Sequence, residues 1–158
     1  MTPRSRVAVV RTSPQTVLQD YSRLMDIAGI REALPVGPEV SLRINISWHV
    51  YMPACSTTPW QLDAVIAKLL ETGHAREKIY AAQNRTVVVD CRVGAVNNNL
   101  QPVLDREHIE IQYLNEKPTA SRIKSSSSGQ RLRIGAVQFV YVLSRTMALK
   151  LLTRPRFG

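Results

Sequence analysis

The stretch TPWQLDAVIAKLLETGHAREKIYAA, residues 58–82, decides the fold. Thr58, Pro59 and Gln61 form the start of a capping box, and Gly73 supplies a stop, so a helix is predicted between them. Its apolar face comprises Leu62, Val65, Ile66, Leu69 and Leu70, at helical spacing. Lys78 to Ala82 is short and apolar and is predicted to be a strand. The stretch therefore combines one amphipathic helix and one strand.

The same alternation extends toward the N-terminus. Val40 to Ser47 alternates apolar and polar residues, which predicts a second strand upstream. Ser13 and Pro14 open a predicted helix that runs to Gly29. Arg6 to Val10 is short, β-branched and apolar, which is typical of a strand buried on both faces.

Toward the C-terminus we predict a helix within 86–104, broken near Pro102, and a fourth strand from Ile109 to Leu114. The resulting order is strand, helix, strand, helix, strand, helix, strand. Such alternation predicts an α/β fold, with a mostly parallel sheet and helices on both faces. The predicted domain covers residues 1–115 and is incomplete.

All of the excess positive charge lies after this domain. The formal net charge is +9, yet residues 117–158 contain no Asp or Glu. We interpret 116–158 as a basic, irregular tail outside the native fold, produced by a truncated or frame-shifted reading. The alternative is a binding module that uses the tail to hold nucleic acid or an anionic membrane surface.

Cysteine usage and hydropathy predict a cytoplasmic protein. Only Cys55 and Cys91 are present, without a secretory cysteine pattern. The apolar run from Ile134 to Leu152 approaches membrane length, but Arg145 and Lys150 interrupt it, so no transmembrane segment is expected.

The loops after the second and third strands are the predicted functional region, because ligands of open α/β sheets bind beyond the carboxyl ends of the strands. The first hypothesis is a small anion held at the start of the helix near Pro59, where backbone N–H groups and the helix dipole favour negative charge. Its predicted ligands are Asn45, Ser56, Thr57, Thr58, Asn84 and Arg85. In the alternative interpretation Thr58 only caps its own helix.

A second hypothesis places a metal ion, or a thiol and its base, at His49 and Cys55, joined by Asp90 and Cys91. Histidine followed six residues later by cysteine is a weak pattern, and a free cysteine is commonly a small apolar core residue. The aromatic residues of this region, Trp48, Tyr51 and Trp60, could stack on a planar ligand, although packing is the preferred interpretation. No reaction, substrate or cofactor follows from these residues.

Three runs in order carry a family resemblance: Ile44 to His49, Pro53 to Leu62 and Asn84 to Asp90. The chain resembles the domain of unknown function 362 family over about residues 6–115. Some members carry a ferredoxin-like pair of iron-sulfur modules after this domain, so the resemblance implies redox or iron-sulfur work. No cysteine follows Cys91, so this chain holds no such module, and the resemblance ends near Glu116.

Overall fold

The computed structural model describes residues 7–53, 55–83, 85–113 and 116, together with the backbone of 138–142 and 149–152. The sheet has five strands in the order β3-β2-β1-β4-β5. The strands are β1 (Val40–Arg43), β2 (Ile79–Gln83), β3 (Glu110–Tyr113), β4 (Gln138–Val142) and β5 (Leu149–Leu152). Every pairing is parallel except that of β4 with β5. The predicted α/β class with a mostly parallel sheet is confirmed.

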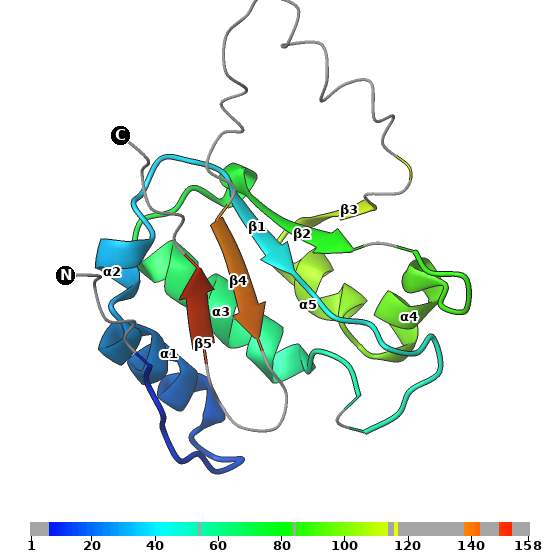
Figure 1. Cartoon of the computed structure of the whole chain (residues 1–158), viewed down its shortest axis with the longest axis horizontal. Coiled ribbons are helices and arrows are strands. Elements are labelled where there is room, and N and C mark those ends of the chain that lie inside the picture. The colour runs from blue at the N-terminus through cyan, green and yellow to red at the C-terminus, as the bar shows by residue number, and fades with distance from the viewer. Residues whose placement is uncertain are drawn as a thin grey trace, which may run out of the picture.

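The described helices that cover the sheet share one side of it, whereas the sequence predicted helices on both faces. The helical elements are α1 (Val17–Ala28), α2 (Ile30–Ala33), α3 (Pro59–Glu71), α4 (Cys91–Asn97), α5 (Gln101–Arg106) and a single 3₁₀ turn, η1 (Arg76–Lys78). In Figure 1, α3 and α5 lie behind the strands, α1 lies beside α3 at the lower left, and none of the described helices lies in front of the sheet. The steps from β1 to β2 and from β2 to β3 run in the same direction across the sheet, so right-handed crossovers place α3 and α5 on the same face.

Helix α3 forms as its sequence predicts. Thr58 is the N-cap, and a capping box joins it to Gln61, with Pro59 at the first helical position. The apolar residues at helical spacing are buried, including Ile66 and Leu69, which are 0% exposed. The amphipathic pattern and its start signal were therefore sufficient to predict this helix.

Helix α1 packs against α3. Tyr21, Leu24 and Met25 form its buried face, and Gly29 ends it in a left-handed conformation with φ of 81°. The helix begins at Val17 and not at Pro14, because the residues from Pro14 to Thr16 form a turn closed by the Thr16 N–H, which donates to the Ser13 carbonyl (3.1 Å). The predicted helix is confirmed, with a later start.

A buried lysine links α1 and α3. The Lys68 side chain is 2% exposed, and its Nζ donates to Asp26 Oδ2 on α1 (2.7 Å) and to Glu71 Oε1 (2.9 Å). Burial alone would lower the Lys68 pKa, but the bonds to the two carboxylates outweigh it, so that the pKa is raised. Lys68 also lines a hollow of about 120 Å³ between the two helices. Because both carboxylates hold its ammonium, we assign Lys68 a structural role.

The predicted first strand is wrong. Within its described part, residues 7–10, a single bridge at Val9 is the only strand-like pairing. Val7 and Val9 are 70% and 67% exposed, and only Ala8 is buried. A strand buried on both faces belongs in the middle of a sheet, but the two neighbours of β1 are β2 and β4. This segment consequently has no place at the sheet centre, whatever its composition suggests.

Two other predicted elements are placed differently. The strand predicted over 40–47 ends at Arg43, because the next residues bond to the loop that precedes α3. The helix predicted over 86–104 divides into α4 and α5 at Asn98 to Leu100, where Asn99 has φ of 57°. Pro102 does not break a helix; it lies in the first turn of α5, where its missing N–H is harmless.

The predicted third and fourth strands are confirmed as β2 and β3, although Leu114 lies outside the described residues. The backbone of β4 and β5 comes from the segment that we interpreted as a tail, and the boundary at Glu116 stays a prediction. Glu116 itself pairs with Arg92 of α4, Arg92 Nη2 lying 2.6 Å from Glu116 Oε2. In the part of the chain that the structure describes, no helix has the length and apolar character needed to cross a membrane.

Candidate functional site

The loops after β1 and β2 leave the same edge of the sheet. The two strands are parallel and in register, with Arg43 opposite Ala82 near their carboxyl ends. We call this edge, with the β1–α3 loop (residues 44–58), the β2–α4 loop (residues 84–90) and α4, the loop edge. Figure 1 shows α4 beyond the end of β2, beside the chain that follows β1. The prediction that these two loops share one edge is confirmed.

Two predicted anion ligands, Ser56 and Thr57, close the β1–α3 loop. The Asn45 N–H donates to Thr57 Oγ1 (2.9 Å), and the Thr57 N–H donates back to the Asn45 carbonyl (2.8 Å). The Ser47 N–H donates to Ser56 Oγ (3.2 Å). Ser56 and Thr57 are each 5% exposed. Both hydroxyl oxygens thus accept a bond from the chain that continues β1, and each hydroxyl keeps a hydrogen to donate.

Asn45 holds the other end of the same loop. Its Nδ2 donates to Ser47 Oγ (2.8 Å) and to the Cys55 carbonyl (3.1 Å), while Ser47 Oγ donates to that carbonyl as well (2.6 Å). Both amide hydrogens of Asn45 are therefore used inside the loop. Its contribution is to fix the loop's shape and not to donate to a ligand.

Thr58 is occupied at the start of α3. Its N–H donates to Gln61 Oε1 (3.3 Å), and the capping box also engages the Gln61 backbone N–H. Pro59, at the first helical position, has no N–H. The start of α3 thus presents fewer unused N–H groups than an uncapped helix would, which favours the interpretation of Thr58 as a cap.

Asp90, suggested as a metal ligand by the sequence, caps α4. Its Oδ1 accepts from the N–H groups of Arg92 (2.9 Å) and Val93 (3.1 Å). These bonds, that of Val93 first, hold the pKa of Asp90 below its ordinary value, and the charges of Arg85 and His49 act in the same direction. Arg85 is exposed, and Asn84 lies outside the described residues. The structure thus brings Arg85 and His49, from two different loops, within electrostatic range of one carboxylate.

The contacts between α4 and the β1–α3 loop were not anticipated. Asn97 Nδ2 donates to the His49 carbonyl (2.7 Å), and Asn98 Nδ2 donates to the Trp48 carbonyl (3.0 Å). Gly94 lies against the same segment, since a Cβ there would overlap Ile46 Cγ2 and meet His49 Cα at 3.4 Å. The Asn-Asn-Asn run at 97–99 was the available signal, because a polar run at a helix end commonly bonds neighbouring backbone.

The metal hypothesis gains no third ligand. No three side chains of His, Cys, Asp or Glu lie close enough together to hold a metal ion among the residues that the structure describes. Cys91 is buried, and burial is the main reason why its pKa is raised, which disfavours the thiolate. Cys55 is half-buried and free, and His49 Nδ1 is buried with no hydrogen-bond partner within the described structure. A metal at His49 and Cys55 stays a prediction.

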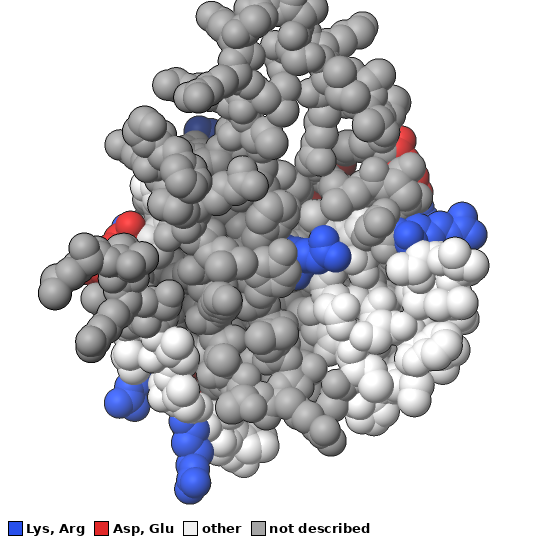
Figure 2. Space-filling model, viewed as in Figure 1, with Lys and Arg blue, Asp and Glu red and all other residues white. Residues whose placement is uncertain are grey.

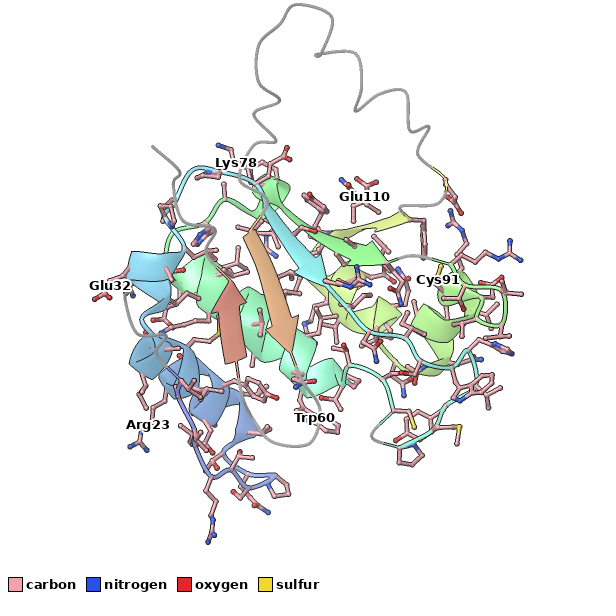
Figure 3. All side chains as sticks on the ribbon, in the orientation of Figure 1. Arg23, Glu32, Trp60, Lys78, Cys91 and Glu110 are labelled. Carbon is pink, nitrogen blue, oxygen red and sulfur yellow. The ribbon has the colours of Figure 1, made fainter. Side chains whose placement is uncertain are left out.

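Exposed apolar side chains cover the loop edge. We call this set the apolar surface; it comprises Trp48, Val50, Tyr51, Met52, Val87, Val88, Val93 and Val96. Figure 2 shows the corresponding area, over α4 and the β1–α3 loop at the lower right, without a Lys, Arg, Asp or Glu side chain. Trp60 of α3, labelled in Figure 3, is also 49% exposed, so neither tryptophan is buried, contrary to the preferred packing interpretation. The apolar surface is the least expected property of this edge.

No family model matches this chain, and neither a curated protein nor a solved structure is similar to it. The loop edge is therefore interpreted from its own residues.

Proposed function

We propose that the loop edge binds a small anion, with Arg85 as its main cationic ligand. The observation that supports this most directly is that Arg85 and His49, from two loops, both lower the pKa of Asp90 at the start of α4. The Oδ1 atom of Asp90 accepts its two capping bonds from the Arg92 and Val93 N–H groups. An arginine at such a position can bind a phosphate or carboxylate through two parallel N–H groups.

The hydroxyls before α3 complete the proposed site. Ser56 and Thr57 accept bonds from the β1 extension and retain hydrogens that can point to an anion. Asn45 keeps the loop in the shape that presents them. The dipole of α3 adds a favourable field, and Thr58 and Asn84 belong to the proposed set on sequence grounds alone.

Inorganic phosphate is the probe for this site. Titration calorimetry with Arg85→Gln is expected to show affinity weaker by about tenfold or more, because a hydrogen bond to a charged group contributes about 1.5 to 3 kcal/mol. Arg23→Gln is the matched control, since Arg23 is exposed on α1, far from α4 in Figure 3. Equal phosphate affinity for the two variants, or none for the unaltered chain, would contradict the anion site.

The metal hypothesis has a separate test. Elemental analysis of the purified chain beside His49→Ala and Cys55→Ala is expected to show metal in the unaltered chain alone. A metal-free chain that both substitutions leave unchanged would remove this hypothesis and leave the anion site in place.

The remaining parts of the proposal come from sequence. Membership of the domain of unknown function 362 family rests on the three quoted runs, and cytoplasmic location rests on cysteine usage. We assign no reaction, because no nucleophile with its base and orienting group is brought together in the described structure.

A further inference from the structure

The apolar surface is presented by a well-held backbone. The side-chain amides of Asn97 and Asn98 donate hydrogen bonds to the carbonyls of His49 and Trp48 in the β1–α3 loop. In the other loop the Val89 N–H donates to Thr86 Oγ1 (3.1 Å), which closes a turn that leaves Val87 fully exposed. Several exposed apolar side chains on backbone that hydrogen bonds hold in place indicate a contact surface.

The composition of this surface matches the interface between water and lipid. Trp48 and Tyr51 are amphipathic aromatic residues, which favour the headgroup level of a bilayer, and valine and methionine favour the acyl boundary beneath it. From Ile44 to Leu62 the sequence holds no Lys, Arg, Asp or Glu, and none stands from Thr86 to Val89. Docking would therefore bury no formal charge from either loop tip.

On the alternative interpretation, in which residues 116–158 belong to the protein, their charge indicates which bilayer would be bound. Residues 117–158 hold nine of the chain's Lys and Arg residues and no acid, and the net charge is +9. Basic segments are attracted to anionic lipids, and stable membrane association needs two signals, such as an apolar insertion and a polybasic segment. A nucleic acid would account for the basic segment but not for exposed valines. A second copy of this chain is disfavoured as the partner, because each copy carries the same net positive charge and the two would repel each other.

We propose that the apolar surface docks on an anionic lipid bilayer, with the tips of the β1–α3 and β2–α4 loops entering its interfacial layer. The basic segment supplies long-range attraction, and the loop tips supply insertion. The surface is independent of the anion site, because it depends on Tyr51, Val87 and Val88 and not on Arg85.

Vesicle sedimentation with the full chain tests this docking. We expect binding to phosphatidylcholine vesicles that contain phosphatidylserine and little binding to pure phosphatidylcholine vesicles. Val87→Asp combined with Val88→Asp should lower the partition coefficient by about tenfold or more, because charges at the insertion depth oppose transfer. Val36→Asp is the matched control, since Val36 is a 56% exposed valine before β1, at the opposite edge of the sheet.

Tryptophan fluorescence gives a second readout. Trp48 and Trp60 are the only tryptophans, so Trp60→Phe leaves Trp48 as the single reporter. Its emission should shift to shorter wavelength on addition of anionic vesicles. Circular dichroism of each variant establishes that it is folded.

Three results would overturn the docking proposal: no binding to anionic vesicles, equal partition of the Val87, Val88 variant and the Val36 variant, or an unshifted Trp48 emission in the bound state. Tight, salt-sensitive binding to DNA or RNA that the loop substitutions leave unchanged, together with equal vesicle partition, would assign the basic segment to nucleic acid instead. Arg85→Gln removes one cation beside the loop tip, so it should weaken phosphate binding strongly and lower vesicle affinity only modestly, while the Trp48 emission shift of the bound protein persists; the two proposals therefore fail separately.

Discussion

Apolar side chains are buried between α1 and α3 but exposed at the loop edge, although hydrogen bonds hold both regions in place. Leu24, Met25, Ile66 and Leu69 are almost wholly buried where the two helices meet. At the loop edge Asp90, Asn97 and Asn98 satisfy the backbone, yet the side chains around them face water. A segment can therefore be well ordered by polar contacts without contributing its apolar side chains to the core.

The largest expected effect separates the two regions by stability. Leu69→Ala should lower the free energy of unfolding by about 2 to 5 kcal/mol, because it leaves a cavity beneath α3. Val88→Ala at the loop edge should stay within about 0.5 kcal/mol, as exposed substitutions do. Urea unfolding followed by circular dichroism measures both. Similar losses for the two variants would show that the loop edge is packed in solution.

A smaller effect is expected where the loop edge is tightly packed. Gly94→Ala places a methyl group against Ile46 and the His49 backbone, and we expect a loss of about 1 to 3 kcal/mol from overpacking. Val93→Ala, on the exposed side of the same helix, is the control and should change stability little. If Gly94→Ala proved as stable as the control, the close approach of α4 to the β1–α3 loop would be disproved.

The ion pair between the helices should contribute less than the core around it. Lys68→Met is expected to cost about 1 kcal/mol, because Asp26 and Glu71 are half-exposed and regain water when the ammonium is removed. Because the pKa of Lys68 is raised on folding, its contribution to stability is complete below the pKa of the unfolded chain, about 10.4. That contribution is lost as the pH rises through the pKa of the folded protein. The stability difference from Lys68→Met should therefore shrink in strongly alkaline solution. A difference that does not change with pH would contradict the pairing.

The smallest effect concerns the cap of α4. Asp90→Asn keeps a side chain that can cap a helix but removes the charge. The lowered pKa of Asp90 implies a contribution that is present above about pH 3.9 and is lost as pH falls through the folded value. The difference in melting temperature between the two proteins should thus decline in acid. A constant difference would show that the charge at this position is irrelevant.

The sequence predicted α3 closely, but its prediction of an N-terminal strand was wrong. The two elements depend on interactions of different range along the chain. The capping box and the apolar face of α3 act within one turn or one helix, so the local sequence is sufficient. Whether residues 7–10 become a strand depends on which segments flank β1, and that is decided by distant parts of the chain. The end of β1 at Arg43 has the same cause, because Thr57 takes the Asn45 N–H.

The candidate site was located by sequence but not described by it. Parallel strands place their following loops at one edge, so the position of Asn45, Ser56, Thr57 and Arg85 followed from topology. Their hydrogen bonds did not, since Ser56 and Thr57 close a loop and Asp90 caps a helix. The exposure of Trp48, Tyr51 and Val87 could not be predicted either. An apolar residue type makes burial more frequent but does not determine whether a given side chain is buried.

By itself the amino-acid sequence determined the α/β class, the helices α1 and α3, the strands β2 and β3, and the concentration of positive charge after Glu116. These depend on periodicity, caps and composition, which act over short distances along the chain. Three features follow from the three-dimensional arrangement alone: α4 holds the β1–α3 loop, Lys68 is buried between two carboxylates, and an apolar surface faces outward. Each of these features depends on contacts between side chains from separate segments, and no local sequence pattern predicts such contacts.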